Sequence, residues 1–165
     1  MTGRIVAMPV KTADKIDAQA SPGRPVWLMS ALGISPLVFF AIALLLVGRQ
    51  SALAAPLADA FKTCAAIILS FQAGIHWGIL LGKSKSALGP GSVAAAFVPS
   101  AIGWIAIFVS EPMCFAFLMV GFTAQGAWDN FAAHRGVLPH WFSKIRMVLT
   151  IIMVAILAVA MFATA

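Results

Sequence analysis

Two ionisable side chains stand inside apolar stretches of the sequence, and their chemistry needs an explanation. His76 lies in the run 64–82 (CAAIILSFQAGIHWGILLG), and Asp129 lies near the end of the apolar run 112–133. An imidazole and a carboxylate can exchange a proton, form an ion pair or hold the polar head of a ligand. An ionisable group at membrane depth costs about 3 kcal/mol on insertion scales, so each of these residues is expected to have a partner.

The spacing of other polar residues suggests which partners these are. Gln72 and His76 are four residues apart and share one helix face, and Gln125 and Asp129 are related in the same way. If both runs cross a membrane in the same direction, these four residues lie at similar depths, and Arg146 enters the last apolar run from the same side. We therefore expect a polar cluster of His76, Asp129, Arg146, Gln72 and Gln125, in which Asp129 pairs with Arg146 or His76.

The roles of these residues remain open from the sequence. His76 could be a hydrogen-bonded structural residue, a ligand for a lipid or quinone head, or a ligand for metal or haem. Haem and metal sites need further ligands at the same depth, whereas His134 and His140 lie in a loop. Asp129 could be a structural ion-pair partner or a proton carrier. The sequence contains no nucleophile–base–acid set and no phosphate loop, so we predict a protein that is not an enzyme, with no cofactor and no metal site.

Composition places the chain in a membrane. Of its 165 residues, 62% are hydrophobic and 10% are charged, which is too little polar surface for a soluble globule. Runs of about 20 apolar residues predict membrane-spanning helices. The predicted spans are 26–47, 58–82, 92–109, 112–133 and 145–164. The expected fold is all-α, a polytopic bundle of about five transmembrane helices in one domain, 25–165, after a mobile basic tail, 1–24.

The positive charges predict orientation rather than nucleic-acid binding. Nine of the 11 Lys and Arg residues fall in the tail and in the segments 82–91 and 134–146, on one side of the predicted membrane. Arg49 and Lys62 fall on the other side. Because Lys and Arg are enriched in cytoplasmic segments, we expect a cytoplasmic N-terminus and a periplasmic C-terminus in a bacterial inner membrane. Asp14 and Asp17 disfavour a mitochondrial presequence, so a mitochondrial inner membrane is the second choice.

Two features predict how individual helices are built. Pro36 lies inside the first span and is expected to kink it, and the Ser35 hydroxyl could bond the carbonyl that the proline leaves free. A stripe of small residues on the second span is expected to pack against a neighbouring helix of the same chain, with homodimerisation as the alternative. The stripe consists of Ser70, Gly74, Gly78 and Gly82.

Two segments carry a family resemblance. The first is 70–78 (SFQAGIHWG), and the second combines Trp128 and Asp129 with 138–150 (LPHWFSKIRMVLT). Both resemble the membrane family of unknown function (domain of unknown function 3429) that includes transmembrane protein 69 and short proteobacterial proteins. The motif residues are Ser70, Gly74, His76, Trp77, Gly78, Trp128, Asp129, Pro139, Trp141 and Arg146. Gln72 departs from the motif, where an apolar residue is expected. The resemblance implies about five spans and an inner-membrane location, and it brings no established activity or cofactor.

Two functions from different classes fit these features. The first is a non-enzymatic accessory or assembly factor that packs against a larger membrane complex or a second copy of the chain. The alternative is a small lipid-, quinone- or proton-handling protein in which His76, Asp129 and Arg146 line a pocket in the inner leaflet. Beyond the lipid bilayer, the sequence names no partner.

Overall fold

The structure is a computed structural model that describes residues 23–81 and 89–165. These residues form five helices and no strand, which confirms the predicted all-α fold. In chain order the helices are α2 (Arg24–Val47), α3 (Ala54–Leu81), α4 (Pro90–Phe108), α5 (Met113–His134) and α6 (His140–Thr164). Residues 1–22 of the expected tail lie outside the described residues, and Arg24 already belongs to α2.

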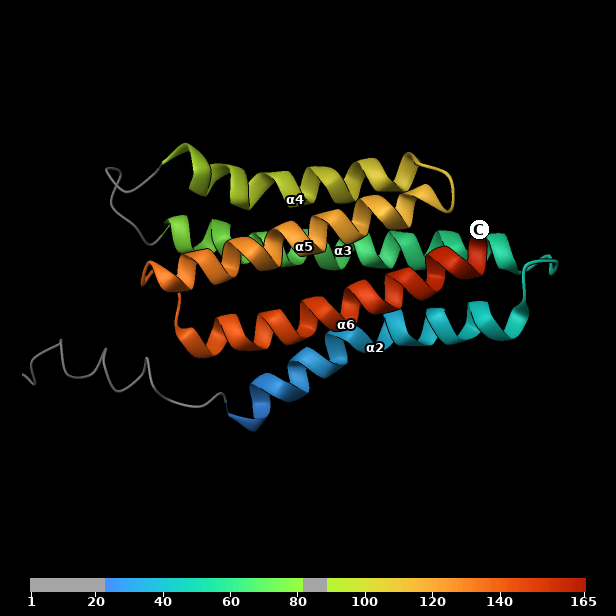
Figure 1. The fold of residues 1–165 in the computed structure, drawn as a ribbon, viewed down its shortest axis with the longest axis horizontal. Coiled ribbons are helices and arrows are strands. Elements are labelled where there is room, and N and C mark those ends of the chain that lie inside the picture. Colours follow the sequence, from blue (N-terminus) through green and yellow to red (C-terminus); the bar gives the residue numbers. More distant parts are fainter. Residues whose placement is uncertain (1–22, 82–88) are drawn as a thin grey trace, which may run out of the picture.

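The helices lie roughly along one common axis and form a bundle (Figure 1). Contacts join α2 to α3 and α6, and α5 to α3 and α6, so these four helices form a ring. The remaining helix, α4, packs on the outside against α3 and α5. Buried side chains of all four ring helices meet in one apolar core, in which the rings of Phe61 and Phe115 lie 5.4 Å apart between centroids.

Two helices, α3 and α6, begin four or more residues earlier than the sequence pattern predicts. Helix α3 begins at Ala54 instead of residue 58, because Pro56 falls in its first turn, where a missing N–H is tolerated. Helix α6 begins at His140 instead of residue 145, directly after Pro139 at its N-cap position. Trp141 therefore belongs to a helix rather than to a loop.

Four of the helices are long and apolar enough to cross a membrane: α2, α3 over Ala54–Ile79, α4 and α6. Large apolar side chains on them are exposed, for example Leu46 at 82% and Met29 at 77%, as contact with lipid requires. Helix α5 falls outside this group because its second half carries Gln125, Asp129 and Asn130. Since both Gln125 and Asp129 are 1% exposed, lipid does not meet these polar groups.

Helix α2 is bent, and its two halves pack differently (Figure 1). Pro36 lies inside the helix, and the Ser35 hydroxyl donates a 2.9 Å hydrogen bond to the carbonyl of Leu32, which confirms the predicted replacement for the missing proline N–H. The buried residues of α2 begin only at Ile34. The first half of the helix therefore diverges from α3 and α6 at the end of the bundle where α6 begins.

The small-residue stripe on α3 does not pack inside the chain, so that prediction was wrong. Gly74 and Gly78 are exposed, and a Cβ added to either would meet nothing within 4 Å. Gly82 lies outside the described residues. The stripe points outward because the opposite face of α3, with Gln72 and His76, is buried. Helices approach each other closely at two other glycines. A Cβ added to Gly121 would lie 2.6 Å from the Leu69 side chain, and a Cβ added to Gly126 would lie 2.6 Å from the Thr150 side chain.

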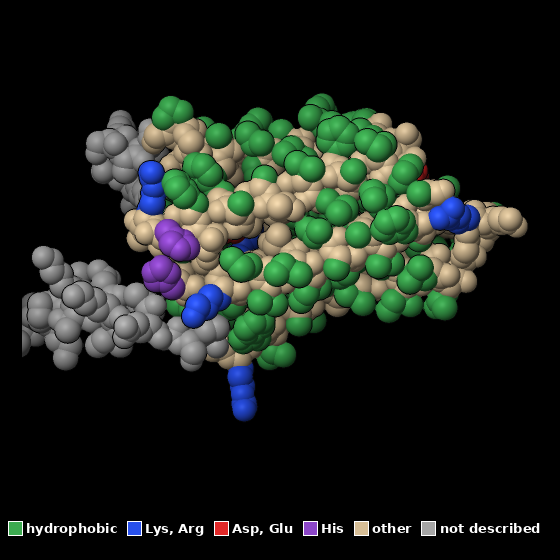
Figure 2. Space-filling model, viewed as in Figure 1, with side chains coloured by type: hydrophobic (Ala, Val, Ile, Leu, Met, Phe, Trp, Pro, Cys, Tyr) green, Lys and Arg blue, Asp and Glu red, His purple; other side chains and the backbone are tan. Residues whose placement is uncertain are grey.

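Charged residues divide between the two ends of the bundle. Figure 2 shows the visible His side chains and most of the visible Lys and Arg side chains at the end where α5 passes into α6, which we call the basic end. At the opposite end, the Lys62 ammonium lies 2.8 Å from Asp59 and 3.1 Å from Glu111. Arg49 at that end donates hydrogen bonds to the last carbonyls of α6, including that of Ala163 at 3.1 Å. At the opposite end, polar contacts thus join two of the connecting segments to helices α3 and α6.

Candidate functional site

Asp129 joins three helices at the basic end of the bundle. Its Oδ1 lies 2.5 Å from Nε2 of His76 on α3, and its Oδ2 accepts a 2.5 Å hydrogen bond from Nε of Arg146 on α6. All three side chains are nine-tenths buried or more, at 7%, 1% and 4% exposure for His76, Asp129 and Arg146. Asp129 therefore contacts both of the partners suggested by the sequence. We call these residues the His76–Asp129–Arg146 triad.

The helices place the triad close to one end of the bundle but not at its surface. His76 precedes the end of α3 at Leu81 by five residues, and Asp129 precedes the end of α5 at His134 by five residues. Arg146 follows the start of α6 at His140 by six. At 1.5 Å per residue, each lies about 8–9 Å from the nearest helix end. A carboxylate at this depth is stabilised because a cation and a second hydrogen-bond donor meet it there.

A second contact between α5 and α6 lies beside the triad. The Ser143 hydroxyl donates a 3.0 Å hydrogen bond to Oδ1 of Asn130. The two residues are neighbours of the triad along the chain, Asn130 after Asp129 and Ser143 one turn before Arg146. The sequence does not predict this pair, because neither residue type nor spacing marks a serine and an asparagine as partners. The contact fixes the register of α6 against α5 and so the position of Arg146.

The two glutamines of the expected cluster lie near the triad but do not bond to it. Gln72, one turn from His76, donates through Nε2 to Sδ of Met153 at 3.4 Å, and its Oε1 has no partner. Gln125, one turn from Asp129, has no partner at either side-chain atom, and Arg146 Nη2 is also unpartnered. All four atoms are buried. In folded proteins, most buried polar atoms have a hydrogen-bond partner, so these four atoms need an explanation.

A groove on the outside of the bundle reaches the triad at Arg146. It has a volume of about 390 Å³ and lies between the diverging first half of α2, α3 and α6. The lining residues are Pro25, Val26, Met29, Ser30, Gly33, Ile34, Ile68, Phe71, Gln72, Ile75, Phe142, Ile145, Arg146, Leu149 and Met153. Most of them are apolar, and the polar side chains among them are Ser30, Gln72 and Arg146. We call this hollow the Arg146 groove; the bend at Pro36 separates its walls.

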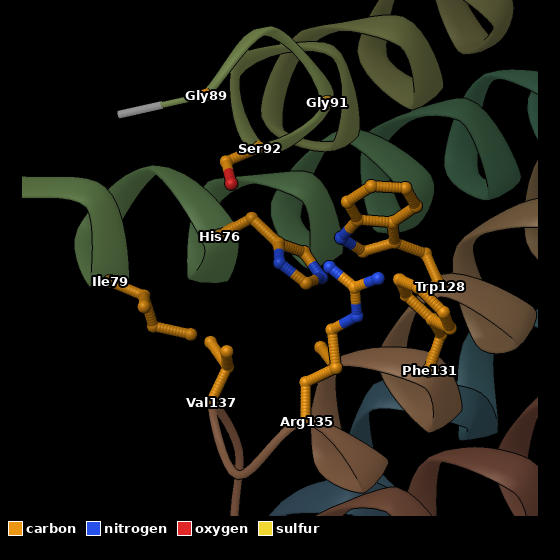
Figure 3. A pocket seen from close by; sticks show the side chains of 10 residues that line it. His76, Ile79, Gly89, Gly91, Ser92, Trp128, Phe131, Arg135 and Val137 are labelled. Carbon is orange, nitrogen blue, oxygen red and sulfur yellow. The ribbon is translucent and has the colours of Figure 1, made fainter. Parts of the chain in front are cut away.

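A second hollow touches the other end of the triad, at His76. This cavity of about 260 Å³ is formed by the ends of α3 and α5 and the start of α4. Figure 3 shows the His76 ring, the Trp128 indole and the Arg135 guanidinium directed into it. Arg135 also lies over the Phe131 ring, with its Cζ 4.4 Å from the ring centroid. The triad therefore stands between an apolar groove on one side and a cavity with a cation on the other.

The remaining motif residues occupy varied positions. Trp77 is 55% exposed on the outside of α3, whereas Ser70, Trp128 and Trp141 are half-buried. His134 and His140 are exposed at the basic end, with ring centroids 6.2 Å apart. Within residues 23–81 and 89–165, no group of three or more His, Cys, Asp and Glu is arranged to hold a metal ion. The structure thus brings together His76, Asp129 and Arg146 and leaves most other motif residues outside this contact.

Comparison with known proteins identifies the family. Residues 22–162 match the family described as "Protein of unknown function (DUF3429)". Comparisons with curated proteins and with solved structures give no match. The matched residues cover most of the chain and include all five helices except the last residues of α6, in agreement with the resemblance carried by the two motif segments. The chain, with its candidate membrane spans, therefore belongs to the DUF3429 family, whose function is unknown.

Proposed function

We propose that this membrane protein binds an amphiphilic molecule dissolved in the bilayer. The tail of the ligand lies in the Arg146 groove, and its polar head lies beside Arg146 and Gln72. One observation carries the proposal: an apolar groove between three candidate membrane spans leads to two buried side chains that each have an unpartnered polar atom. An unpaired buried donor or acceptor costs about 1–3 kcal/mol, and a polar head that bonds it recovers this cost.

The position of the groove supports a ligand that arrives through the membrane. The groove is bordered by exposed apolar side chains of candidate membrane spans, such as Met29 on α2 and Phe71 on α3, at 77% and 75% exposure. A water-soluble ligand would have to cross this apolar border. A lipid or quinone instead reaches it by lateral diffusion, with its tail already in an apolar surrounding. Ligand sites are commonly apolar hollows with a few polar groups that fix orientation.

We propose binding rather than catalysis, and a ligand rather than a larger protein as the partner. Both oxygens of the Asp129 carboxylate are occupied, one by His76 and the other by Arg146, which favours a fixed, positioning role for Asp129. Exposed apolar side chains on α4, including Phe97 and Phe108, would suit an assembly partner. Contact with lipid tails requires the same side chains, so they give the accessory-factor hypothesis no separate support.

Filling the groove is expected to abolish ligand retention without unfolding the protein. Gly33 lines the groove, and a Cβ added there meets nothing within 4 Å, so the Gly33→Leu side chain can begin without a clash and add volume to the groove. The matched control is Gly74→Leu, which adds the same side chain to open space on α3 away from the groove. The measurement is mass spectrometry of the amphiphiles that copurify with each variant in mild detergent. Equal retention by both variants and the unmodified protein would exclude the groove as the binding site.

We further propose that the basic end faces the cytoplasm of a bacterium, with the protein in the inner membrane. Support comes from the nine Lys and Arg residues assigned to that side, against two on the other. In a background without Cys64 and Cys114, Thr164→Cys is expected to react with a membrane-impermeant maleimide in intact cells. A cysteine at His140 is expected to react only after the membrane is opened. The reverse labelling pattern would overturn the orientation.

A further inference from the structure

The charges around the Arg146 groove favour a neutral ligand head. Arg146 is the one charged residue among the described residues that line the groove, and its Nε already bonds Asp129. His76 bonds the other oxygen of the same carboxylate. The carboxylate of Asp129 and the guanidinium of Arg146 carry opposite formal charges and compensate each other. A phosphate placed beside Arg146 would lie close to Asp129, and the described residues that line the groove include no further cation to compensate it. Burial of an uncompensated charge is strongly unfavourable.

The unpartnered atoms of Arg146 and Gln72 require one hydrogen-bond acceptor and one hydrogen-bond donor on the ligand. Arg146 Nη2 can only donate a hydrogen bond, and Gln72 Oε1 can only accept one. The orientation of the Gln72 amide follows from its neighbour, because Nε2 donates to the Met153 sulfur, which is an acceptor and not a donor. A ligand head that satisfies both groups therefore carries an oxygen that accepts and a hydroxyl that donates. A phosphodiester has acceptors but no donor.

The walls of the groove suit a flat, polarisable ring. The rings of Phe71 and Phe142 line the groove together with the thioethers of Met29 and Met153. Aromatic rings pack favourably against other rings and against methionine sulfur. Ile34, Ile68 and Leu149 continue the surface as branched aliphatic side chains. These walls match a ring-shaped head followed by a hydrocarbon tail better than they match a glycerol backbone with several ester oxygens.

We infer that the ligand of the Arg146 groove is a lipid-soluble quinol. Its ring oxygen accepts from Arg146, its hydroxyl donates to Gln72, and its tail leaves the groove toward the bilayer. This inference rests on the proposed function, because it names the chemical class that fills the same groove. The oxidised quinone lacks the hydroxyl donor, so it leaves Gln72 Oε1 unpaired and binds more weakly. The inference concerns binding alone and involves no electron transfer.

The test compares two redox forms of one probe. Decylubiquinol under argon is expected to bind the purified protein about tenfold more tightly than decylubiquinone, as expected for one buried hydrogen bond. In Gln72→Leu this preference is expected to fall to near parity. Gln125→Leu is the matched control, because Gln125 is also a buried glutamine but does not line the groove, and this variant is expected to retain the preference. The measurement is isothermal titration in detergent, with thermal unfolding in parallel to report folding.

Different failures separate this inference from the proposed function. Equal affinities of the unmodified protein for the two redox forms would overturn the quinol assignment. The quinol assignment would also be overturned if neither decyl probe bound and the protein instead bound phosphatidylglycerol in a way that Gly33→Leu abolishes. That result would still support the proposed binding of an amphiphile. If Gly33→Leu changed the binding of none of the three probes, both the quinol assignment and the proposed function would be overturned. If the Gln72→Leu variant does not fold, Gln72→Met takes its place in the test, because methionine also lacks Oε1.

Discussion

Replacing Asp129 by alanine is expected to lower the free energy of unfolding by about 3–5 kcal/mol, the usual cost of removing one partner from a buried ion pair. Asp129 is 1% exposed and bonds both His76 and Arg146. Its loss leaves the Arg146 guanidinium buried without a counter-charge. The measurement is reversible unfolding in mixed micelles of dodecyl maltoside and sodium dodecyl sulfate, followed by circular dichroism.

A carboxylate on the surface provides the control for this variant. Asp59 also contacts a cation, with 2.8 Å between its Oδ1 and Lys62 Nζ, but its side chain is 64% exposed. An exposed ion pair contributes about 0–1 kcal/mol, and Lys62 keeps Glu111 as a partner. Asp59→Ala is therefore expected to change stability little. Similar losses for the two aspartates would contradict the buried charge pairing described for Asp129.

A double variant separates lost charge pairing from lost packing. Asp129→Leu together with Arg146→Met removes both charges and fills the space with apolar atoms. Replacement of a whole buried ion pair by well-packed apolar residues is often neutral or stabilising. We expect the double variant to recover most of the stability that Asp129→Ala loses, while losing the binding proposed for Arg146. If the double variant were as unstable as Asp129→Ala, packing around His76 rather than charge would dominate at this position.

Replacing Gly126 by leucine is expected to force α5 and α6 apart. A Cβ at this position would lie 2.6 Å from Oγ1 and 3.0 Å from Cγ2 of Thr150, well inside van der Waals contact. Overpacking of this kind typically costs about 1–3 kcal/mol. Gly126 also lies one turn from Asp129 on the same helix, so separation of the helices stretches the bond between Asp129 and Arg146. The expected result therefore combines lower stability with weaker ligand binding.

The control for Gly126→Leu is the exposed glycine on α3. Gly74→Leu adds the same side chain where a Cβ meets nothing within 4 Å, and it is expected to leave both stability and ligand binding unchanged. A Gly126→Ala variant grades the effect, since it adds only the Cβ. If Gly126→Leu were as stable as Gly74→Leu, the close approach of α5 to α6 would be relaxed easily and would not determine the triad geometry.

The triad shows which contacts the spacing of residues along the sequence can predict and which it cannot. The depths of His76, Asp129 and Arg146 follow from the alternation of spans, so the sequence could suggest that they meet. The same reasoning placed Gln72 and Gln125 in the cluster, yet neither bonds to the triad. Depth along a helix is one coordinate, and rotation about the helix axis is another. Which atoms touch depends on both, and rotation is set by packing against neighbouring helices.

The small-residue stripe on α3 also shows that residue spacing does not determine how a helix is rotated about its axis. Gly74 and Gly78 have the spacing that lets two helices approach closely, and the prediction of internal packing was reasonable for a membrane helix. Their exposure follows from a competition between the two faces of α3. The face with Gln72 and His76 must turn inward because lipid cannot solvate it, and this turns the glycines outward. Close helix packing occurs instead at Gly121 and Gly126, which no sequence pattern singles out.

The sequence by itself determined the helical membrane architecture, the family and the kink at Pro36, because apolar length, motif segments and a missing N–H act locally or along one dimension. It also suggested the triad, because depth can be counted along helices. Only the tertiary structure decided which face of each helix is buried, that Asp129 bonds both of its neighbours, and that the first half of α2 diverges to leave the Arg146 groove. These features depend on the rotation and tilt of helices that are distant in the chain, and side-chain packing across the whole bundle sets them.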